Sequence, residues 1–134
     1  MPPDAPTPGT GGDWLERAKS ALAIARQPMP EVVFWEDLCY QAQQAAEKAI
    51  KAVFIHKRLI FAYTHDIEEL GAELEEKGVV VPAHIKEAIS LSRYATETRY
   101  PGYFEPVTED EFRQAVALAE RAIEWAERVL KEPA

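Results

Sequence analysis

Apolar residues recur along most of this chain at intervals of three and four positions, the spacing that places side chains on one face of an α-helix. The first such segment opens at Asp13, which with Glu16 has the spacing of a capping box, and it is closed by Pro28 and Pro30. The second and longest covers about residues 34–59, and its apolar face is rich in alanine. Because alanine side chains are small, we expect a neighbouring helix to pack closely against this one.

The second half of the chain contains three further helical patterns. One covers about residues 66–77, with an acidic first turn and Gly78 as its stop, and the next begins at Pro82. The last opens with a second capping box, Thr108 and Glu111. No segment alternates between apolar and polar residues over a useful strand length. We therefore predict an all-α fold, an up-and-down antiparallel bundle of about five helices with a four-helix core.

Composition divides the chain into a short tail and one domain. Residues 1–12 hold four of the ten prolines and three of the six glycines, so we expect a disordered tail before a bundle at residues 13–131. A length of 134 residues suits one domain. No run reaches the ~18 apolar residues that span a bilayer, and no secretion signal precedes the bundle. We expect a cytoplasmic protein without membrane contact.

The formal net charge is −8, which by itself argues against phosphate-bearing ligands. This charge is unevenly distributed, because residues 66–80 carry −5 and residues 103–134 carry −4, whereas residues 81–102 carry +1. A nucleotide or a short strand is therefore compatible with the middle segment. Long, sequence-independent nucleic-acid binding is not, because it needs a broad basic surface.

Several kinds of site are excluded because their residues are missing from the sequence. There is no glycine-rich phosphate loop, and no histidine follows a glutamate at the spacing used by dimetal helical bundles. One cysteine and scattered histidines do not make a zinc site, so we expect no metal and no cofactor. Cys39 lies on an apolar helical face and is expected to be a buried, unreactive thiol.

Two clusters of basic and aromatic residues remain as candidate sites. Arginine binds phosphate oxygens through paired hydrogen bonds and aromatic rings stack on bases, so either cluster has the chemistry for a nucleotide or RNA. Each also has a structural explanation, because Lys57 and Arg58 suit the end of a long helix and Arg93 is able to pair with an acid of the last helix. The first cluster is His56, Lys57, Arg58, Tyr63 and His65, and the second is Arg93, Tyr94, Arg99, Tyr100, Tyr103 and Phe104.

Trp14 with its helix and three later segments of the chain together resemble a HEPN domain. The later segments are residues 40–52, which read Tyr-Gln-Ala-Gln-Gln-Ala-Ala-Glu-Lys-Ala-Ile-Lys-Ala, then His65-Asp66-Ile67 with Leu70, and then Thr98-Arg99-Tyr100-Pro101. The resemblance extends over about residues 13–130. It implies a helical bundle that is often homodimeric, binds a nucleotide, and is paired in a toxin–antitoxin-like system with a separately encoded minimal nucleotidyltransferase.

The basic and aromatic clusters and the resemblance to a HEPN domain together predict a non-catalytic module that binds a nucleotide or an RNA phosphate. The second cluster supplies the predicted ligand-binding residues, Arg93, Tyr94, Arg99 and Tyr100. Some members of the resembled family are metal-independent ribonuclease toxins that use an arginine and a histidine a few residues apart on a late helix. Here no histidine follows Arg93 or Arg99, which argues against that activity.

Two alternatives stay open at this point. One is a metal-independent ribonuclease in which Arg58 stabilises the phosphate charge and His65 transfers the proton, since these two have six residues between them. The other is an interaction module in which both clusters are structural and apolar surface forms a dimer contact. Convergence of Arg58, His65, Arg93 and Arg99 on one groove would support a ligand site, and dispersal would support the interaction module.

Overall fold

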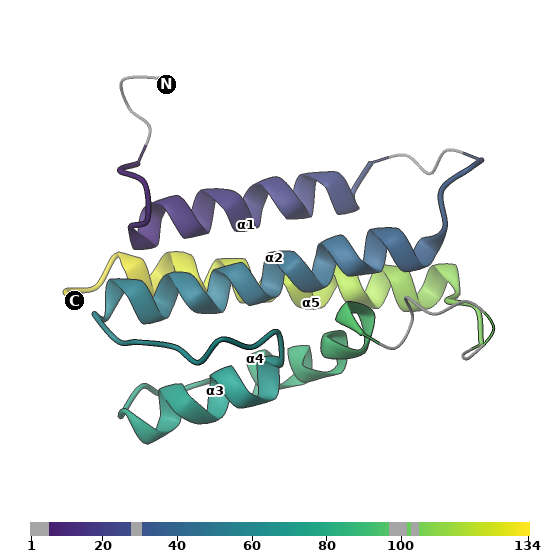
Figure 1. The fold of residues 1–134 in the computed structure, drawn as a ribbon. Coiled ribbons are helices and arrows are strands. Elements are labelled where there is room, and N and C mark those ends of the chain that lie inside the picture. Colours follow the sequence, from purple (N-terminus) through teal and green to yellow (C-terminus); the bar gives the residue numbers. More distant parts are fainter. Residues whose placement is uncertain (1–5, 28–30, 97–101, 103–104) are drawn as a thin grey trace.

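The computed structural model describes residues 6–27, 31–96, 102 and 105–134, and every regular element in them is helical (Figure 1). The predicted all-α fold is therefore confirmed. Two of the helices are 22 residues long, and the shortest has four residues. The elements are α1 (Gly11–Ala25), α2 (Trp35–His56), α3 (Ile67–Glu76), α4 (Ala83–Lys86), the 3₁₀-helix η1 (Glu87–Ala95) and α5 (Glu109–Leu130).

The long helices lie side by side with α2 in the centre, flanked by α1 and α5 (Figure 1). Helices α1 and α2 are antiparallel, since Gly11 at the start of α1 lies against His56 at the end of α2. Helix α5 runs in the same direction as α2: the start of α2 meets the start of α5, where Trp35 packs on Phe112 with ring centroids 4.8 Å apart. This parallel arrangement arises because α4 and η1 carry the chain back across the bundle before α5 begins.

The contact between α1 and α2 consists largely of alanine, as the sequence predicted for a close helix pair. A Cβ atom added to Gly11 would lie only 3.1 Å from the carbonyl oxygen of Ala52. Larger side chains would force these two helices apart, because packed interiors leave little room for added methylene groups. The buried alanines of the two helices are Ala18, Ala21, Ala25, Ala42, Ala45, Ala46, Ala49 and Ala52.

The predicted N-cap of the first helix is wrong by three residues. Helix α1 begins at Gly11, inside the segment expected to be a tail, and its N-cap is Thr10 rather than Asp13. The Thr10 hydroxyl accepts a hydrogen bond from the Asp13 backbone N–H, while the Asp13 carboxylate accepts from Gly9 N–H and pairs with Arg17. Threonine and aspartate are both good caps, and here the first of them takes the position.

Two other predicted helix ends are confirmed. Gly78 ends the third helix with φ of 84°, a left-handed backbone that glycine adopts at little cost. Thr108 and Glu111 form a complete capping box at the start of α5, each side chain bonded to the backbone of the other.

The fourth predicted helix is mainly a 3₁₀-helix. After the four residues of α4, the nine residues of η1 follow the tighter 3₁₀ winding. A 3₁₀-helix has three residues per turn, so every third side chain lies in one straight row. The buried residues Ile85, Ala88, Leu91 and Tyr94 follow this spacing and anchor the segment to the bundle.

Candidate functional site

A line of three polar residues crosses the otherwise alanine-rich core face of α2. Gln43, Glu47 and Lys51 are four residues apart, so they lie on one side of the helix. All three are buried, with exposed fractions of 0%, 3% and 7%. Charged residues are almost never fully buried unless they are paired. These three side chains therefore need hydrogen-bond and charge partners from within the protein.

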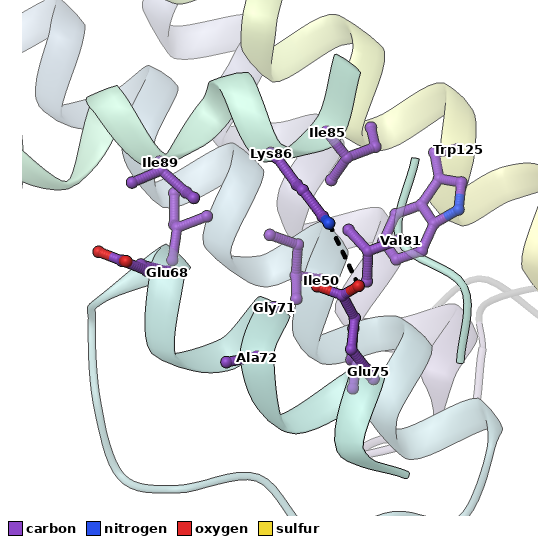
Figure 2. A pocket seen from close by; sticks show the side chains of 12 residues that line it. Ile50, Glu68, Gly71, Ala72, Glu75, Val81, Ile85, Lys86, Ile89 and Trp125 are labelled. Carbon is purple, nitrogen blue, oxygen red and sulfur yellow. Dashed lines mark ion pairs between the residues drawn. The ribbon is translucent and has the colours of Figure 1, made fainter. Parts of the chain in front are cut away.

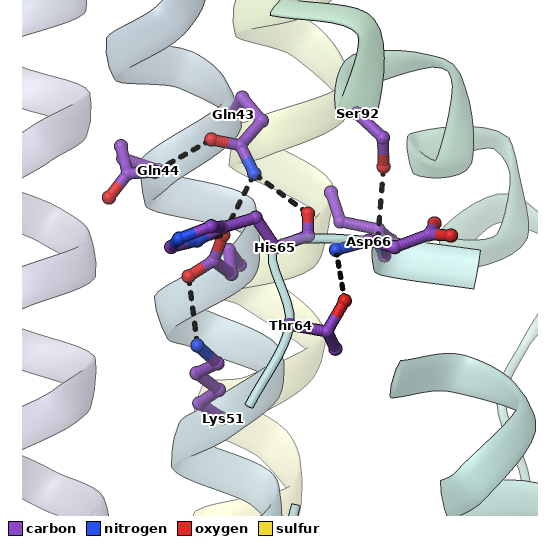
Figure 3. A network of polar contacts seen from close by, with 9 residues as sticks. Gln43, Gln44, Lys51, Thr64, His65, Asp66 and Ser92 are labelled. Atoms are coloured by element: carbon purple, nitrogen blue, oxygen red, sulfur yellow. Dashed lines mark hydrogen bonds and ion pairs between the residues drawn. The ribbon is translucent and has the colours of Figure 1, made fainter. Parts of the chain in front are cut away.

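The carboxylate of Glu47 lies at the centre of this network (Figure 3). Its Oε1 atom accepts a hydrogen bond from Gln43 Nε2 at 2.9 Å and lies 2.9 Å from His65 Nδ1. Its Oε2 atom accepts from Lys51 Nζ at 2.9 Å. The Lys51 ammonium also lies 5.0 Å from the ring centroid of Phe61 and 5.9 Å from that of Trp14, so aromatic faces cover its remaining side.

His65 has its two ring nitrogens in different surroundings. A carboxylate only accepts hydrogen bonds, so the Nδ1 atom that faces Glu47 carries the proton and Nε2 of the neutral ring holds a lone pair. The side chain is 63% exposed. A buried carboxylate that orients an imidazole in this way is also found in acid–base catalysis, but such a pair needs a substrate-binding group beside it.

The same network ties the connection between α2 and α3 to the bundle. Gln43 Nε2 donates to the backbone oxygen of His65 at 3.3 Å, and the Thr64 hydroxyl accepts from the Asp66 backbone N–H at 3.0 Å. The first residue of α3, Ile67, donates its backbone N–H to the Ser92 hydroxyl of η1 at 3.0 Å (Figure 3). These contacts hold an irregular segment in place, which is a structural role that needs no ligand.

The structure does not bring Arg58 to His65. Arg58 is exposed just beyond the end of α2, with a left-handed φ of 60°, and the chain from there to His65 is not helical. His65 contacts Glu47, which precedes Arg58 by eleven residues along α2. At 1.5 Å per residue this corresponds to about 16 Å of separation along the helix axis. The ribonuclease alternative requires both side chains at one phosphate.

Arg93 and Tyr94 lie at the opposite end of the bundle from Arg58. Arg93 Nη1 is 3.4 Å from Glu111 Oε2, which confirms the expected pairing with an acid of the last helix. The Arg93 guanidinium also lies 5.4 Å from the ring centroid of Tyr94. Its Nε atom is buried and has no hydrogen-bond partner among the described residues. Arg93 is therefore held in place while one buried donor, Nε, has no partner among the described residues.

Tyr94 faces the core, where it meets Cys39. The tyrosine is 5% exposed and the cysteine 0%, and the two side chains lie close enough to influence each other's pKa. Burial raises the pKa of the Cys39 thiol to about 12 and that of the Tyr94 hydroxyl to about 12. Cys39 thus has the buried, protonated thiol that its place in the sequence predicted. With its ring in this position, Tyr94 offers no face on which a base could stack.

The remaining two predicted ligand-binding residues, Arg99 and Tyr100, lie outside the described residues. Within the part of the chain that the structure describes, no group of three His, Cys, Asp or Glu side chains is arranged to hold a metal ion. In that same part, no helix is both long and apolar enough to cross a membrane.

The network around Glu47 is not among the sites predicted from the residues. Gln43, Glu47 and Lys51 belong to the segment that carries the family resemblance, and one signal in the sequence points to them. Three polar side chains at four-residue intervals interrupt a buried face that is otherwise apolar and rich in alanine. A polar residue on a predicted core face indicates an internal partner, since an unpaired one would cost free energy.

Comparison with known proteins gives one consistent result. Residues 12–129 match the sequence model of a family described as HEPN domain. TT1696 from Thermus thermophilus has a similar solved structure, with 33% identity, a TM-score of 0.78, and coverage of 90% of this chain and 98% of its own. ST0689, an archaeal HEPN homologue, is 26% identical with a TM-score of 0.71 and the same coverage. No curated protein matches the sequence.

Proposed function

The chain belongs to the HEPN domain family, and from this premise we propose that it is a non-catalytic helical module that acts while bound to a second protein. The partner class is a separately encoded minimal nucleotidyltransferase, as the sequence resemblance implied. The observation that carries this proposal is a group of large apolar side chains exposed on neighbouring connections, Ile60, Tyr63 and Val80, with exposed fractions of 85%, 101% and 82%.

Hydrogen bonds to α3 and to the residue that follows it fix the connection that carries Ile60 and Tyr63. Lys77 Nζ donates to the backbone oxygen of Ile60 at 2.8 Å, and the Ala62 backbone N–H donates to Glu73 Oε2 at 3.1 Å. The connection before α3 is thereby held along α3 itself. Exposed apolar groups rimmed by charges are typical of protein interaction sites. The surrounding residues 66–80 carry a net charge of −5, so a complementary partner surface is basic.

The spread of the candidate residues supports binding over catalysis. Arg58 and Arg93 lie near opposite ends of α2, which at 22 residues is about 33 Å long, and His65 lies between them. Of the three, His65 and Arg93 each face a carboxylate of this chain. A ribonuclease site needs the arginine and the histidine at one phosphate, and this arrangement separates them.

The proposal predicts a complex that depends on the exposed apolar group. Co-expressed with the minimal nucleotidyltransferase whose gene lies nearest to its own, the protein should elute as a complex in size-exclusion chromatography with light scattering. Changing Ile60 and Tyr63 together to serine should weaken that complex by about tenfold or more, which corresponds to at least ~1.4 kcal/mol. The same measurement on the protein alone reports whether it forms the homodimer that the resemblance implied.

Val32 offers the matched control for this experiment. It is 86% exposed like the apolar group, but lies in the connection before α2 and not beside α3. Val32→Ser should leave the complex unchanged. Absence of any complex, or equal weakening by both changes, would contradict the proposed module.

A second candidate function, phosphate binding at Arg93, is favoured by one specific observation. The Arg93 Nε atom is buried without a hydrogen-bond partner among the described residues, and buried donors are normally satisfied. A phosphate oxygen would satisfy this donor, and the Arg99-Tyr100 segment follows closely in the chain. Against it stand the nearby carboxylates Glu36 and Glu111, which reduce the local positive charge.

Calorimetric titration distinguishes this candidate from the partner module. We expect ATP, GTP or a short single-stranded RNA to bind wild type about tenfold more tightly than Arg93→Ala or Arg99→Ala, a difference of ~1.4 kcal/mol. Arg113→Ala is the control, because Arg113 is an exposed arginine of α5 whose ion pairs, within the described part of the chain, are with acids of the first turn of α5. Equal affinities for wild type and the Arg99→Ala variant would remove the phosphate site. Cleavage of the RNA that disappears in His65→Ala would instead restore the ribonuclease alternative.

A further inference from the structure

A pocket of about 240 Å³ opens between α3 and the α4–η1 segment (Figure 2). Its walls are mostly apolar, with Ile50, Leu74 and Trp125 among the lining residues. An apolar cavity of about 150 Å³ is already large enough to hold benzene. This pocket has room for a phenyl-sized group with a short chain, and none of the interactions described so far makes use of it.

Gly71 on α3 keeps this pocket open. It lies in the middle of a ten-residue helix, where glycine is less stable than alanine. A Cβ atom added at Gly71 would have nothing within 4 Å, so no close packing accounts for the glycine. Gly71 is also one of the residues that line the pocket. The missing side chain therefore leaves space on the wall against which a ligand would lie.

One wall of the pocket belongs to the acidic segment 66–80. Glu75 Oε2 of α3 lies 3.2 Å from Lys86 Nζ of α4, and Figure 2 shows the two side chains meeting across the pocket. Both are about half exposed, and exposed ion pairs contribute little to stability, so this one separates at little cost. Glu68 also lines the pocket, but Figure 2 shows its carboxylate pointing away from Glu75 and Lys86. The acidic segment 66–80, which contains Glu75 and carries a net charge of −5, favours a cation over an anion.

We propose that this pocket binds a small amphipathic amine, with its apolar body along Gly71, Val81 and Ile89 and its ammonium group at Glu75. The ammonium replaces that of Lys86, whose side chain is already half exposed and moves into solvent. The volume of the pocket limits the apolar body of the ligand to roughly ten carbon atoms. The charge of Glu75 favours an ammonium as the head group, because a carboxylate in its place would be repelled by Glu75. The site is independent of the proposed protein partner, which contacts residues outside the pocket.

A matched pair of probes tests the proposal. In ¹H–¹⁵N spectra of the full chain, 4-phenylbutylammonium should shift the amides of Gly71, Ala72 and Ile85. The carboxylate of the same shape, 4-phenylbutyrate, should bind at least tenfold more weakly. Glu75→Gln should lower the affinity for the ammonium severalfold while leaving that for the carboxylate unchanged or higher.

A variant that fills the pocket provides a second test of the proposal. Gly71→Leu places an apolar side chain in the open space and replaces a poor helix former by a good one, so the thermal midpoint should stay the same or rise. Binding of 4-phenylbutylammonium should then be lost. Ala23→Leu, which adds the same side chain on the exposed face of α1, should retain it. Equal binding of both probes, shifts outside the pocket, no binding at all, or undiminished binding to Gly71→Leu would each overturn the proposal.

Discussion

Replacing Glu47 with alanine is expected to lower the free energy of unfolding by about 3–5 kcal/mol, the usual cost of removing one partner from a buried ion pair. The carboxylate is the common acceptor for Lys51, Gln43 and His65. Without it the Lys51 ammonium, whose side chain is 8% exposed, stays buried between two aromatic rings with no counter-charge. Urea denaturation followed by circular dichroism at 222 nm measures the loss.

A double variant separates the ion pair from the rest of the network. Apolar residues of similar size often replace a buried pair without loss, so Glu47→Leu combined with Lys51→Met should recover most of the stability that Glu47→Ala loses. If the double variant stays as unstable as the single one, the stability lost in Glu47→Ala comes from the bonds to Gln43 and His65 and not from the ion pair. A loss below about 1 kcal/mol for Glu47→Ala would show that the site is hydrated and that the buried pair is not a stabilising requirement.

The Phe54→Ala variant is expected to lose about 3–5 kcal/mol of stability, because removal of a buried aromatic side chain costs both its transfer free energy and the cavity that remains. Phe54 is fully buried at 0% exposure, and its ring meets Phe61 edge to face with centroids 5.7 Å apart. Phe61 in turn covers Lys51, so the cavity would open beside the polar network. Chemical denaturation reports the change as a lower midpoint.

Phe34 provides the control within the same helix region. It precedes α2, makes no capping hydrogen bond through its side chain and is 68% exposed. Phe34→Ala should change stability by less than about 0.5 kcal/mol. Similar losses in both variants would mean that Phe34 is covered in solution, for example by a second copy of the chain.

Local signals predicted most of the fold correctly. The capping box at Thr108 and the stop at Gly78 depend only on residues within one turn, so the sequence contains the whole cause. The start of α1 was misplaced because Thr10 and Asp13 are both good caps, and the choice depends on Gly11 packing against α2. That contact joins residues more than forty positions apart, which periodicity does not reveal.

The candidate site was harder to predict for the same reason. The pairing of Arg93 with the last helix followed from the acids of that helix, and the structure confirms it with Glu111. The bond between His65 and Glu47 depends on the path of the irregular chain between α2 and α3, which no helical pattern describes. Tyr94 is a predicted ligand-binding residue, but it belongs to the buried row of η1, which places it in the core beside Cys39.

The tight winding of η1 constrains how this segment can change in length during evolution. A 3₁₀-helix rises about 2.0 Å per residue and turns about 120°, so removing one residue rotates the whole following row out of the core. Removing three residues restores the alignment of Ala88, Leu91 and Tyr94 and only shortens the segment by about 6 Å. Insertions and deletions in related chains should therefore occur here in multiples of three, whereas the α-helices should not show that rule.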